Sequence, residues 1–474
     1  MADQQPPALT RDVVSSALRY ADTWLALRRR QLRLPGVQTA AWYDDAQVLG
    51  SAHGLADVEA GVPLTNEHLF RAASHSKTFT ATAVLQLRDA GRLRLDDRVG
   101  DWLTAVDAGG PVAGRTLADL LAHAGGVVRD GDRADHWQLS RTFPDVPELL
   151  ALCGPGSAVL PAQARFKYSN LGYAVLGLVV AAVAGEPYNA HVTREIVQRL
   201  GLRRTGPDLD RSRSRRYATA YTGLSYADQR IPVEQVQTRA LSPAAGFSST
   251  AAELCRFASA HFLGDPRLLS DEAKRRMQHE QWEDGAGGAY GLGLVVSRVG
   301  ARRLVGHGGA YPGHNTCTLL DPVARLAVSV CVNALDGPAT ELATAVVRLV
   351  DLAAAQAVSP SDGDAVTRAR FCGRYASLWG VLDVADLGGR LVALDPTRPD
   401  PTTYPTQLRI EDDRTLGIVS ASGYAAVAEK LEFVFGGAAG VRSLRGNGGV
   451  TYLPLHEQRQ RLAGLDRVSA SDAS

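Results

Sequence analysis

The sequence predicts an α+β fold in which helices flank an antiparallel sheet, followed by a small antiparallel β-barrel. The chain has 474 residues, which is more than one ordinary hydrophobic core contains and implies two domains. Strand-like segments lie toward both ends of residues 1–357 with a mainly helical block between them, which indicates one sheet with helices on its faces. After a linker at 358–367, residues 368–474 read as short strands and glycine-rich turns, a pattern typical of a small barrel.

The elements of the first domain follow from apolar periodicity and turn residues. An N-terminal helix is expected at about 12–33, where Pro35 and Gly36 end it. Two strands follow at 39–43 and 48–52. A helix begins near Ser74, and a mainly helical region extends to about residue 285. Four strands and a last helix complete the domain, at 291–299, 304–307, 316–320, 326–333 and 338–356.

Beyond the linker the sequence pattern changes to short apolar segments separated by glycine-rich turns. Gly388-Gly389 and the run Gly446 to Gly449 are typical of hairpin turns. Short strands at this spacing favour a barrel or sandwich. The strands are expected at 381–385, 390–394, 407–410, 415–419, 431–435 and 450–453.

Composition excludes several functional classes. Apolar residues make up 45% and charged residues 21%, as in a globular protein, and the net charge of +1 offers no field for nucleic acid or an anionic membrane. No run of 18 apolar residues and no secretion signal occurs, so a cytoplasmic location is expected. Five scattered cysteines indicate buried thiols, and no histidine has zinc-ligand spacing. We therefore expect no metal and no cofactor.

The most informative stretch is FRAASHSKTFTATAVLQL, which contains Ser74 and Lys77. Residues three apart share a helix face, so the hydroxyl and the amine can meet. A hydroxyl becomes a good nucleophile when a neighbouring base takes its proton, and a desolvated lysine can be that base. The alternative interpretation is a helix cap followed by a surface lysine.

Two later segments carry further candidate residues. Tyr168 and Asn170 lie on a loop before the apolar run AVLGLVVAAVAG, where a phenol can relay a proton and an amide can both donate and accept. His307-Gly308-Gly309 and Ala310 follow a short strand and indicate a glycine-rich turn that brings backbone N–H groups to a ligand. The alternatives are a packing tyrosine and a simple turn.

The ordered set Ser74-x-x-Lys77, Tyr168-Ser169-Asn170 and His307-Gly308-Gly309 resembles the active site of the penicillin-recognising serine hydrolases, which include class C β-lactamases, DD-peptidases, family VIII esterases and D-aminopeptidases. The segments LLAHAGG at 120–126 and AAGFSST at 244–250 resemble two further family segments. The resemblance covers about residues 12–355 and implies a β-lactamase/transpeptidase-like domain. The C-terminal part is similar to the lipocalin-like domain of some members.

The resemblance implies a role for each candidate residue. Ser74 would attack a carbonyl and form an acyl-enzyme, with Lys77 and Tyr168 handling the protons. Which of these two is the base stays open. The backbone N–H groups of Ser74 and Ala310 would form the oxyanion hole, and Asn170 would hold Lys77 or the substrate amide. His307 would assist Tyr168 or line the acyl pocket, with Gly308 and Gly309 beside it.

One departure from the family pattern bears on the substrate. β-Lactam-binding members carry Lys-Thr-Gly where this chain has His307-Gly308-Gly309. A histidine there resembles the esterase, amidase and peptidase branches of the family, which implies an ester, amide or peptide substrate. Histidine is also only partly charged at neutral pH, which disfavours anchoring of a β-lactam carboxylate. Three functions stay open: a serine hydrolase, an acyltransferase or peptide cyclase using the same acyl-enzyme, and a non-catalytic scaffold. The expected partner is a small molecule or short peptide, and homo-oligomer formation is left open.

Overall fold

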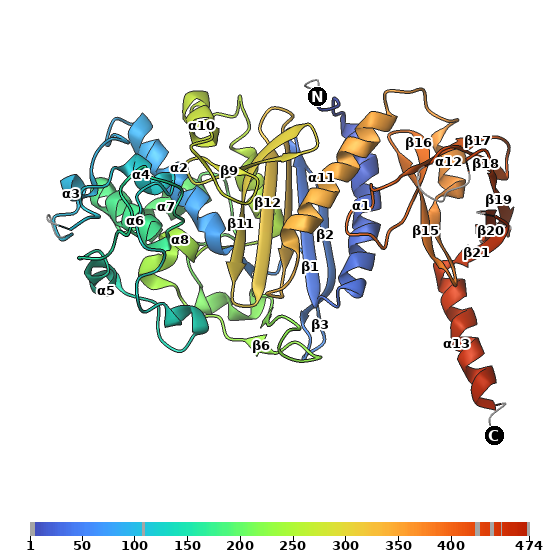
Figure 1. Ribbon diagram of the computed structural model, residues 1–474, viewed down its shortest axis with the longest axis horizontal. Helices are drawn as coiled ribbons and strands as arrows, with labels where there is room; N and C mark the ends of the chain where they lie inside the picture. The colour runs from blue at the N-terminus through green and yellow to red at the C-terminus, as the bar shows by residue number, and fades with distance from the viewer. Residues whose placement is uncertain (1–4, 107–109, 422–426, 437–439, 447, 472–474) are drawn as a thin grey trace. The chain divides into compact units, whose positions relative to one another are not determined.

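The structure of the protein is a computed structural model that describes residues 5–106, 110–421, 427–436, 440–446 and 448–471. The chain divides into two compact units (Figure 1). One is built on Arg33–Thr344, and the other on Pro6–Leu32 together with Ala345–Ser474. The domains expected at 1–357 and 368–474, with their linker at 358–367, stay a prediction.

The first unit contains a nine-stranded antiparallel sheet, which confirms the predicted α+β class. Strands from the two ends of this unit meet in its middle, where Val37 pairs with Val332. The strand order is β3-β2-β1-β13-β12-β11-β10-β9-β8. The bounds are β1 Gly36–Tyr43, β2 Ala46–Asp57, β3 Val62–Pro63, β8 Trp282–Glu283, β9 Ala289–Tyr290, β10 Val295–Val299, β11 Arg302–Tyr311, β12 His314–Asp321 and β13 Leu326–Val332.

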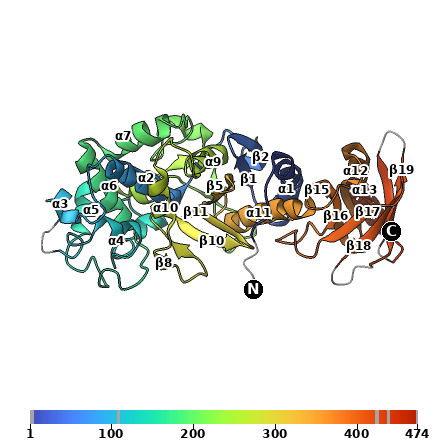
Figure 2. The same cartoon turned by 90° about the horizontal axis from the view of Figure 1, so that it is seen from above.

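A helical block fills the chain between β3 and β8 and lies beside the sheet in both views (Figures 1 and 2). Two short strand pairs, β4–β7 and β5–β6, tie its loops together. The bounds are β4 Phe70–Arg71, η1 Ala73–His75, α2 Ser76–Asp89, α3 Val99–Trp102, α4 Leu117–Leu121, η2 Asp135–Gln138, α5 Val146–Ala151, α6 Asn170–Ala184, α7 Tyr188–Val192, η3 Thr193–Gln198, η4 Arg211–Arg216, β5 Ala220–Tyr221, β6 Pro232–Val233, η5 Arg239–Leu241, α8 Ser242–Ala245, β7 Ser248–Ser249, α9 Ala251–Ser259 and α10 Asp271–Gln278.

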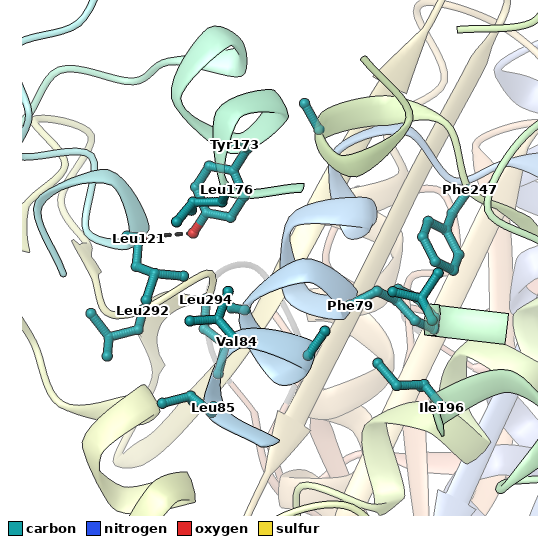
Figure 3. Packing of buried hydrophobic residues seen from close by; sticks show 14 of the residues in the cluster. Phe79, Val84, Leu85, Leu121, Tyr173, Leu176, Ile196, Phe247, Leu292 and Leu294 are labelled. Atoms are coloured by element: carbon teal, nitrogen blue, oxygen red, sulfur yellow. Dashed lines mark hydrogen bonds between the residues drawn. The ribbon is translucent and has the colours of Figure 1, made fainter. Parts of the chain in front are cut away.

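Helix α2 lies at the centre of this block and is buried along almost its whole length. On one side Phe79 stacks against Phe247 and Phe257, with ring centroids 4.1 and 3.7 Å apart. On the other side Val84 and Leu85 belong to the same apolar core (Figure 3). Burial of each large apolar side chain contributes about 1.5–3 kcal/mol, so the turn that precedes α2 rests on a rigid support.

The second unit contains a closed eight-stranded barrel, which confirms the predicted C-terminal barrel. Strand β14 closes it by pairing with β21, with Ala376 opposite Leu453. Phe371 and Phe433 meet edge to face in its core. The bounds are β14 Gly373–Ser377, β15 Gly380–Leu387, β16 Arg390–Leu394, β17 Thr406–Ile410, β18 Thr415–Ser420, β19 Lys430–Phe435, β20 Val441–Gly446 and β21 Val450–Pro454, and the helices outside the block are α1 Arg11–Gln31, α11 Ala339–Gln356, α12 Ala365–Phe371 and α13 Leu455–Ser471.

None of the described helices alone is both long and apolar enough to cross a membrane. Helix α6 and the segment Tyr188–Gln198 meet that requirement only as a pair, and the pair is bent by 80°.

Candidate active site

Ser74 lies on a single 3₁₀ turn, Ala73–His75, immediately before α2, where the sequence predicts the start of a helix. The preceding residue, Ala73, has a left-handed φ of 48°, a strained conformation that costs on the order of 1–3 kcal/mol. Hydrogen bonds hold the turn in place, because the Ser76 hydroxyl donates to Ala73 O at 2.6 Å and accepts from Phe247 N at 3.0 Å. The Ser74 side chain stays partly exposed on this fixed turn.

The Lys77 amine is fully buried beside Ser74, at 3.1 Å from its Oγ. Lys77 Nζ also donates to Asn170 Oδ1 and to Ala244 O, each at 2.8 Å. Burial lowers the pKa of Lys77 well below its ordinary value, against the opposing charge of Asp130. A neutral amine has two N–H donors and one lone pair. Two carbonyl acceptors use the donors, so the lone pair is left for the Ser74 hydroxyl.

Tyr168 approaches Ser74 from the second motif, and its hydroxyl donates to Ser74 Oγ at 2.8 Å. Desolvation raises the pKa of Tyr168 above its ordinary value, so the phenol keeps its proton at neutral pH. The ring lies 4.7 Å from Lys77 Nζ and 4.3 Å from the His123 ring. His123 Nδ1 accepts a hydrogen bond from Ser169 N at 3.1 Å, which fixes the loop that carries Tyr168.

Asn170 links Lys77 to an acidic residue that the sequence did not point to. Its amide nitrogen donates to Asp130 Oδ1 at 2.7 Å, and Trp137 Nε1 donates to the same oxygen at 3.0 Å. Both bonds fix the orientation of the Asn170 amide, which keeps its oxygen on Lys77. Asp130 follows the LLAHAGG segment by four residues, and that proximity was the available signal.

The third motif lies within strand β11, and the prediction of a turn at this place is wrong. His307 pairs with Thr318 of β12, and its ring lies 6.3 Å from that of His75 on the Ser74 turn. The strand can pass so close because Gly309 has no side chain. A Cβ at Gly309 would lie 2.1 Å from Ala72 O. The sheet thus brings the third motif beside the Ser74 turn.

His307 is buried and held between two hydrogen-bond partners. Its Nε2 lies 3.1 Å from the Tyr290 hydroxyl and its Nδ1 2.6 Å from Gly308 O. An Nδ1–H that donates to the carbonyl leaves Nε2 to accept from the phenol, so both bonds suit a neutral ring. Burial lowers the pKa of His307 to about 3. His307 is therefore uncharged at neutral pH. Gly308 precedes Gly309 on the strand, and the exposed Ala310 pairs with Asn315.

The part of the chain that the structure describes contains no group of three or more His, Cys, Asp or Glu side chains arranged to hold an ion. The side chains around Ser74 are an amine, a phenol and an amide, which suit proton transfer and hydrogen bonding.

Comparison with known proteins identifies the family of the chain. The model of the Beta-lactamase family matches residues 21–352. The chain belongs to that family and thus to the penicillin-recognising serine hydrolases.

Individual relatives share about 30% identity with parts of this chain. Penicillin-binding protein 4 of Amycolatopsis lactamdurans is 29% identical over 49% of this chain, which spans 61% of that relative's length. Esterase EstB of Burkholderia gladioli is 30% identical over 43% of this chain and 55% of its own.

Solved structures share the fold at lower identity. The octameric penicillin-binding protein homologue from Pyrococcus abyssi aligns with a TM-score of 0.64 and 21% identity, over 92% of this chain and 99% of its own. The D-amino acid amidase from Ochrobactrum anthropi SV3 aligns with a TM-score of 0.61 and 23% identity, over 72% of this chain and 98% of its own.

Proposed function

We propose that the protein is a serine hydrolase that cleaves an ester, amide or peptide through an acyl-enzyme on Ser74. One observation carries the proposal: the Ser74 hydroxyl lies between a buried amine at 3.1 Å and a phenol at 2.8 Å. A nucleophile within hydrogen-bond reach of a base, with the base fixed by further partners, is the arrangement that nucleophilic catalysis requires. The names of relatives, which include an esterase and an amidase, support the same reaction class.

The reaction runs in two steps. Ser74 Oγ attacks the carbonyl carbon while its proton passes to Lys77, and the oxygen that becomes negative is held by the N–H groups of Ser74 and Ala310. Tyr168 gives a proton to the leaving group as the scissile bond breaks, and the Lys77 ammonium replaces that proton. Water then attacks the acyl-enzyme and loses its proton by the same route, which releases the acid and restores Ser74.

The two alternative functions named from the sequence make different demands on the same residues. The acyltransferase or peptide cyclase differs only in the acceptor, which would be an amine or an alcohol in place of water. A scaffold without chemistry would have no need to keep Lys77 buried against Ser74, since burying an amine is costly.

Intact-mass analysis tests the proposal. The protein is exposed to 4-nitrophenyl esters of increasing acyl size and quenched in acid. We expect a mass increase of one acyl group, located on Ser74 by peptide mapping and absent in Ser74→Ala. Ser214→Ala, which alters an exposed serine of η4, is the matched control and should still be labelled. Absence of acylation by every ester would reject the proposal, and product formed only with an added amine would favour the acyltransferase.

The charge state of His307 predicts substrate preference. Because the ring is neutral at pH 7, it cannot act as the fixed cation that anchors a β-lactam carboxylate. Acetyl and butyryl esters should therefore be cleaved with a higher kcat/KM than penicillins or cephalosporins. Steady-state kinetics with both classes checks this, and a penicillin turned over faster than the esters would contradict it.

The pH profile should be set by Lys77. The amine must be neutral to accept the Ser74 proton, so activity is present above the lowered pKa of Lys77 and is lost as the pH falls through it. Asp130→Asn removes a negative charge that raises this pKa, so the acid limb of kcat/KM should move to lower pH. His307→Gln should leave the limb in place, because the pKa of His307 is already about 3. A limb that disappears in His307→Gln would assign it to the histidine.

A further inference from the structure

Arg129 lies beside the proposed active site, and its backbone is fixed by the second motif. Its carbonyl accepts hydrogen bonds from Asn170 N at 2.9 Å and Leu171 N at 3.0 Å, at the start of α6. Its guanidinium carbon lies 5.3 Å from the centroid of the Tyr168 ring. The side chain is 66% exposed, so this cation lies next to the phenol and open to solvent.

The guanidinium has unused hydrogen-bonding capacity. Its Nε lies 3.4 Å from Asp130 Oδ2, which is an ion pair at the limit of contact. Asp130 is itself largely buried and already accepts hydrogen bonds from Asn170 and Trp137. No acceptor for Nη1 or Nη2 of Arg129 occurs among the residues with described positions. Two parallel N–H donors of this kind match the two oxygens of a carboxylate.

The other basic groups at the site do not supply a positive charge to a ligand. Lys77 is fully buried and held by Asn170 and Ala244, and His307 is a buried neutral ring held by Tyr290 and Gly308. Among the described side chains in contact with Tyr168, Arg129 thus combines a permanent charge with exposure to solvent.

We propose that Arg129 binds a carboxylate on the leaving-group side of the substrate and so selects acyl donors whose leaving group is an anion. We assign the leaving-group side because the guanidinium lies beside Tyr168, the residue that we propose to protonate the leaving group. The inference rests on the proposed serine hydrolase function and adds the substrate class.

The distances also limit where the carboxylate can be. The path from the guanidinium through the Tyr168 ring to Ser74 Oγ is about 11 Å at most, which equals roughly three residues of extended chain. A leaving group of one to three residues with a free carboxyl end, or an aromatic alcohol with a ring carboxylate, fits this reach.

A matched pair of esters tests the proposal. 4-Acetoxybenzoate and 4-acetoxybenzamide transfer the same acetyl group and differ in the charge of the leaving group. At a pH on the activity plateau, the wild-type protein should prefer the anion. Arg129→Gln should lower kcat/KM for the anion by about 10- to 100-fold, mainly through KM, as expected for loss of charge-assisted hydrogen bonds. The amide ester should change little, and Arg129→Lys should recover part of the preference.

Two controls keep the outcomes distinct. Arg298→Gln changes an exposed arginine on β10 that pairs with Arg303. It should leave kcat/KM for both esters unchanged. Binding of 4-acetoxybenzoate to Ser74→Ala, measured by calorimetry, should weaken on adding Arg129→Gln even where no turnover occurs.

Each contrary result has one meaning. If Arg129→Gln lowers kcat/KM equally for both esters, the residue acts through Tyr168 or Lys77, and the proposal is overturned. Equal wild-type rates for the two esters would overturn it as well. Failure of the wild type to be acylated by either ester would instead reject the serine hydrolase function on which the inference rests.

Discussion

Ser74→Ala should lower turnover of a 4-nitrophenyl ester by about 10⁴-fold or more, the loss that follows removal of one member of a catalytic unit. Lys77→Ala should cost nearly as much, because Ser74 then has the phenol of Tyr168 as its remaining partner, and that phenol donates to Ser74 rather than accepting from it. The double variant should lose little beyond either single variant, since residues that act together are not additive. Steady-state kinetics checks all three.

The variants need a separate measure of folding, because Lys77 is buried. Lys77→Ala leaves the Asn170 carboxamide oxygen and Ala244 O without their donor, which costs roughly 1–3 kcal/mol each where no water replaces it. Ser74→Ala removes a partly exposed hydroxyl, and Lys77 keeps its bonds to Asn170 and Ala244. Thermal unfolding should therefore separate the two, with Lys77→Ala less stable. Substantial activity in a folded Ser74→Ala protein would show that the nucleophile is another residue.

Local patterns were enough to predict much of the fold. The apolar spacing after Ser74 predicts α2, and the paired strands at the two ends of the first unit predict a shared sheet, which the pairing of β1 with β13 confirms. Strand β16 occupies the predicted residues 390–394. These elements are set by side-chain periodicity and turn residues, which are visible in short windows of sequence.

The sequence did not predict several other elements, for physical reasons. Strand β20, Val441–Gly446, holds two arginines, a serine and a glycine among its six residues, so it lacks a strong apolar pattern. Strand β14, Gly373–Ser377, pairs with β15 over its whole length and with β21 where the barrel closes, and both partners lie outside a short sequence window. Helices α12 and α13 are polar and were also not anticipated. In each case tertiary pairing or a weak amphipathic pattern, rather than local propensity, decides the structure.

The candidate site divides in the same way. Ser74 and Lys77 are three residues apart, and a helix brings them together directly. Asp130, which accepts from Asn170, and Ala244 O, which accepts from Lys77, come to the site through the packing of segments distant in sequence. Ala244 begins the AAGFSST segment and Asp130 follows LLAHAGG, but neither segment alone predicts these contacts. Arg129 was missed for the same reason, since its place beside Tyr168 depends on how its loop caps α6.

The error at the third motif concerns backbone packing. Consecutive glycines favour a turn in local sequence, and His307 to Ala310 nevertheless form part of β11. Their conformation is extended because the strand pairs with β12 from Val305 to Tyr311. The glycines serve close approach: at Gly309 the carbonyl of Ala72 occupies the space that a side chain would need.

That close approach leads to a prediction at Gly309. In Gly309→Ala the new methyl group would lie 2.1 Å from Ala72 O and 2.7 Å from Thr316 Oγ1, so strand and turn must separate. Ala72 immediately precedes the strained Ala73 and Ser74, and Ala310 follows Gly309. A shift therefore changes the spacing of the two proposed oxyanion donors. We expect kcat to fall by about 10²- to 10³-fold, the loss seen when an oxyanion donor is misplaced.

The neighbouring glycine provides the comparison. A Cβ at Gly308 would meet Thr316 O at 3.5 Å and Thr340 Oγ1 at 3.9 Å, which are ordinary contacts, so Gly308→Ala should be the milder change in both kcat and thermal unfolding. Neither glycine has a left-handed φ, so the difference between the two variants isolates the contact with Ala72 from backbone strain. Acylation of Ser74 by a 4-nitrophenyl ester, followed by stopped flow, measures the step in which the oxyanion forms. Equal acylation rates in the two variants would show that the Ala72 contact does not set the geometry of the oxyanion site.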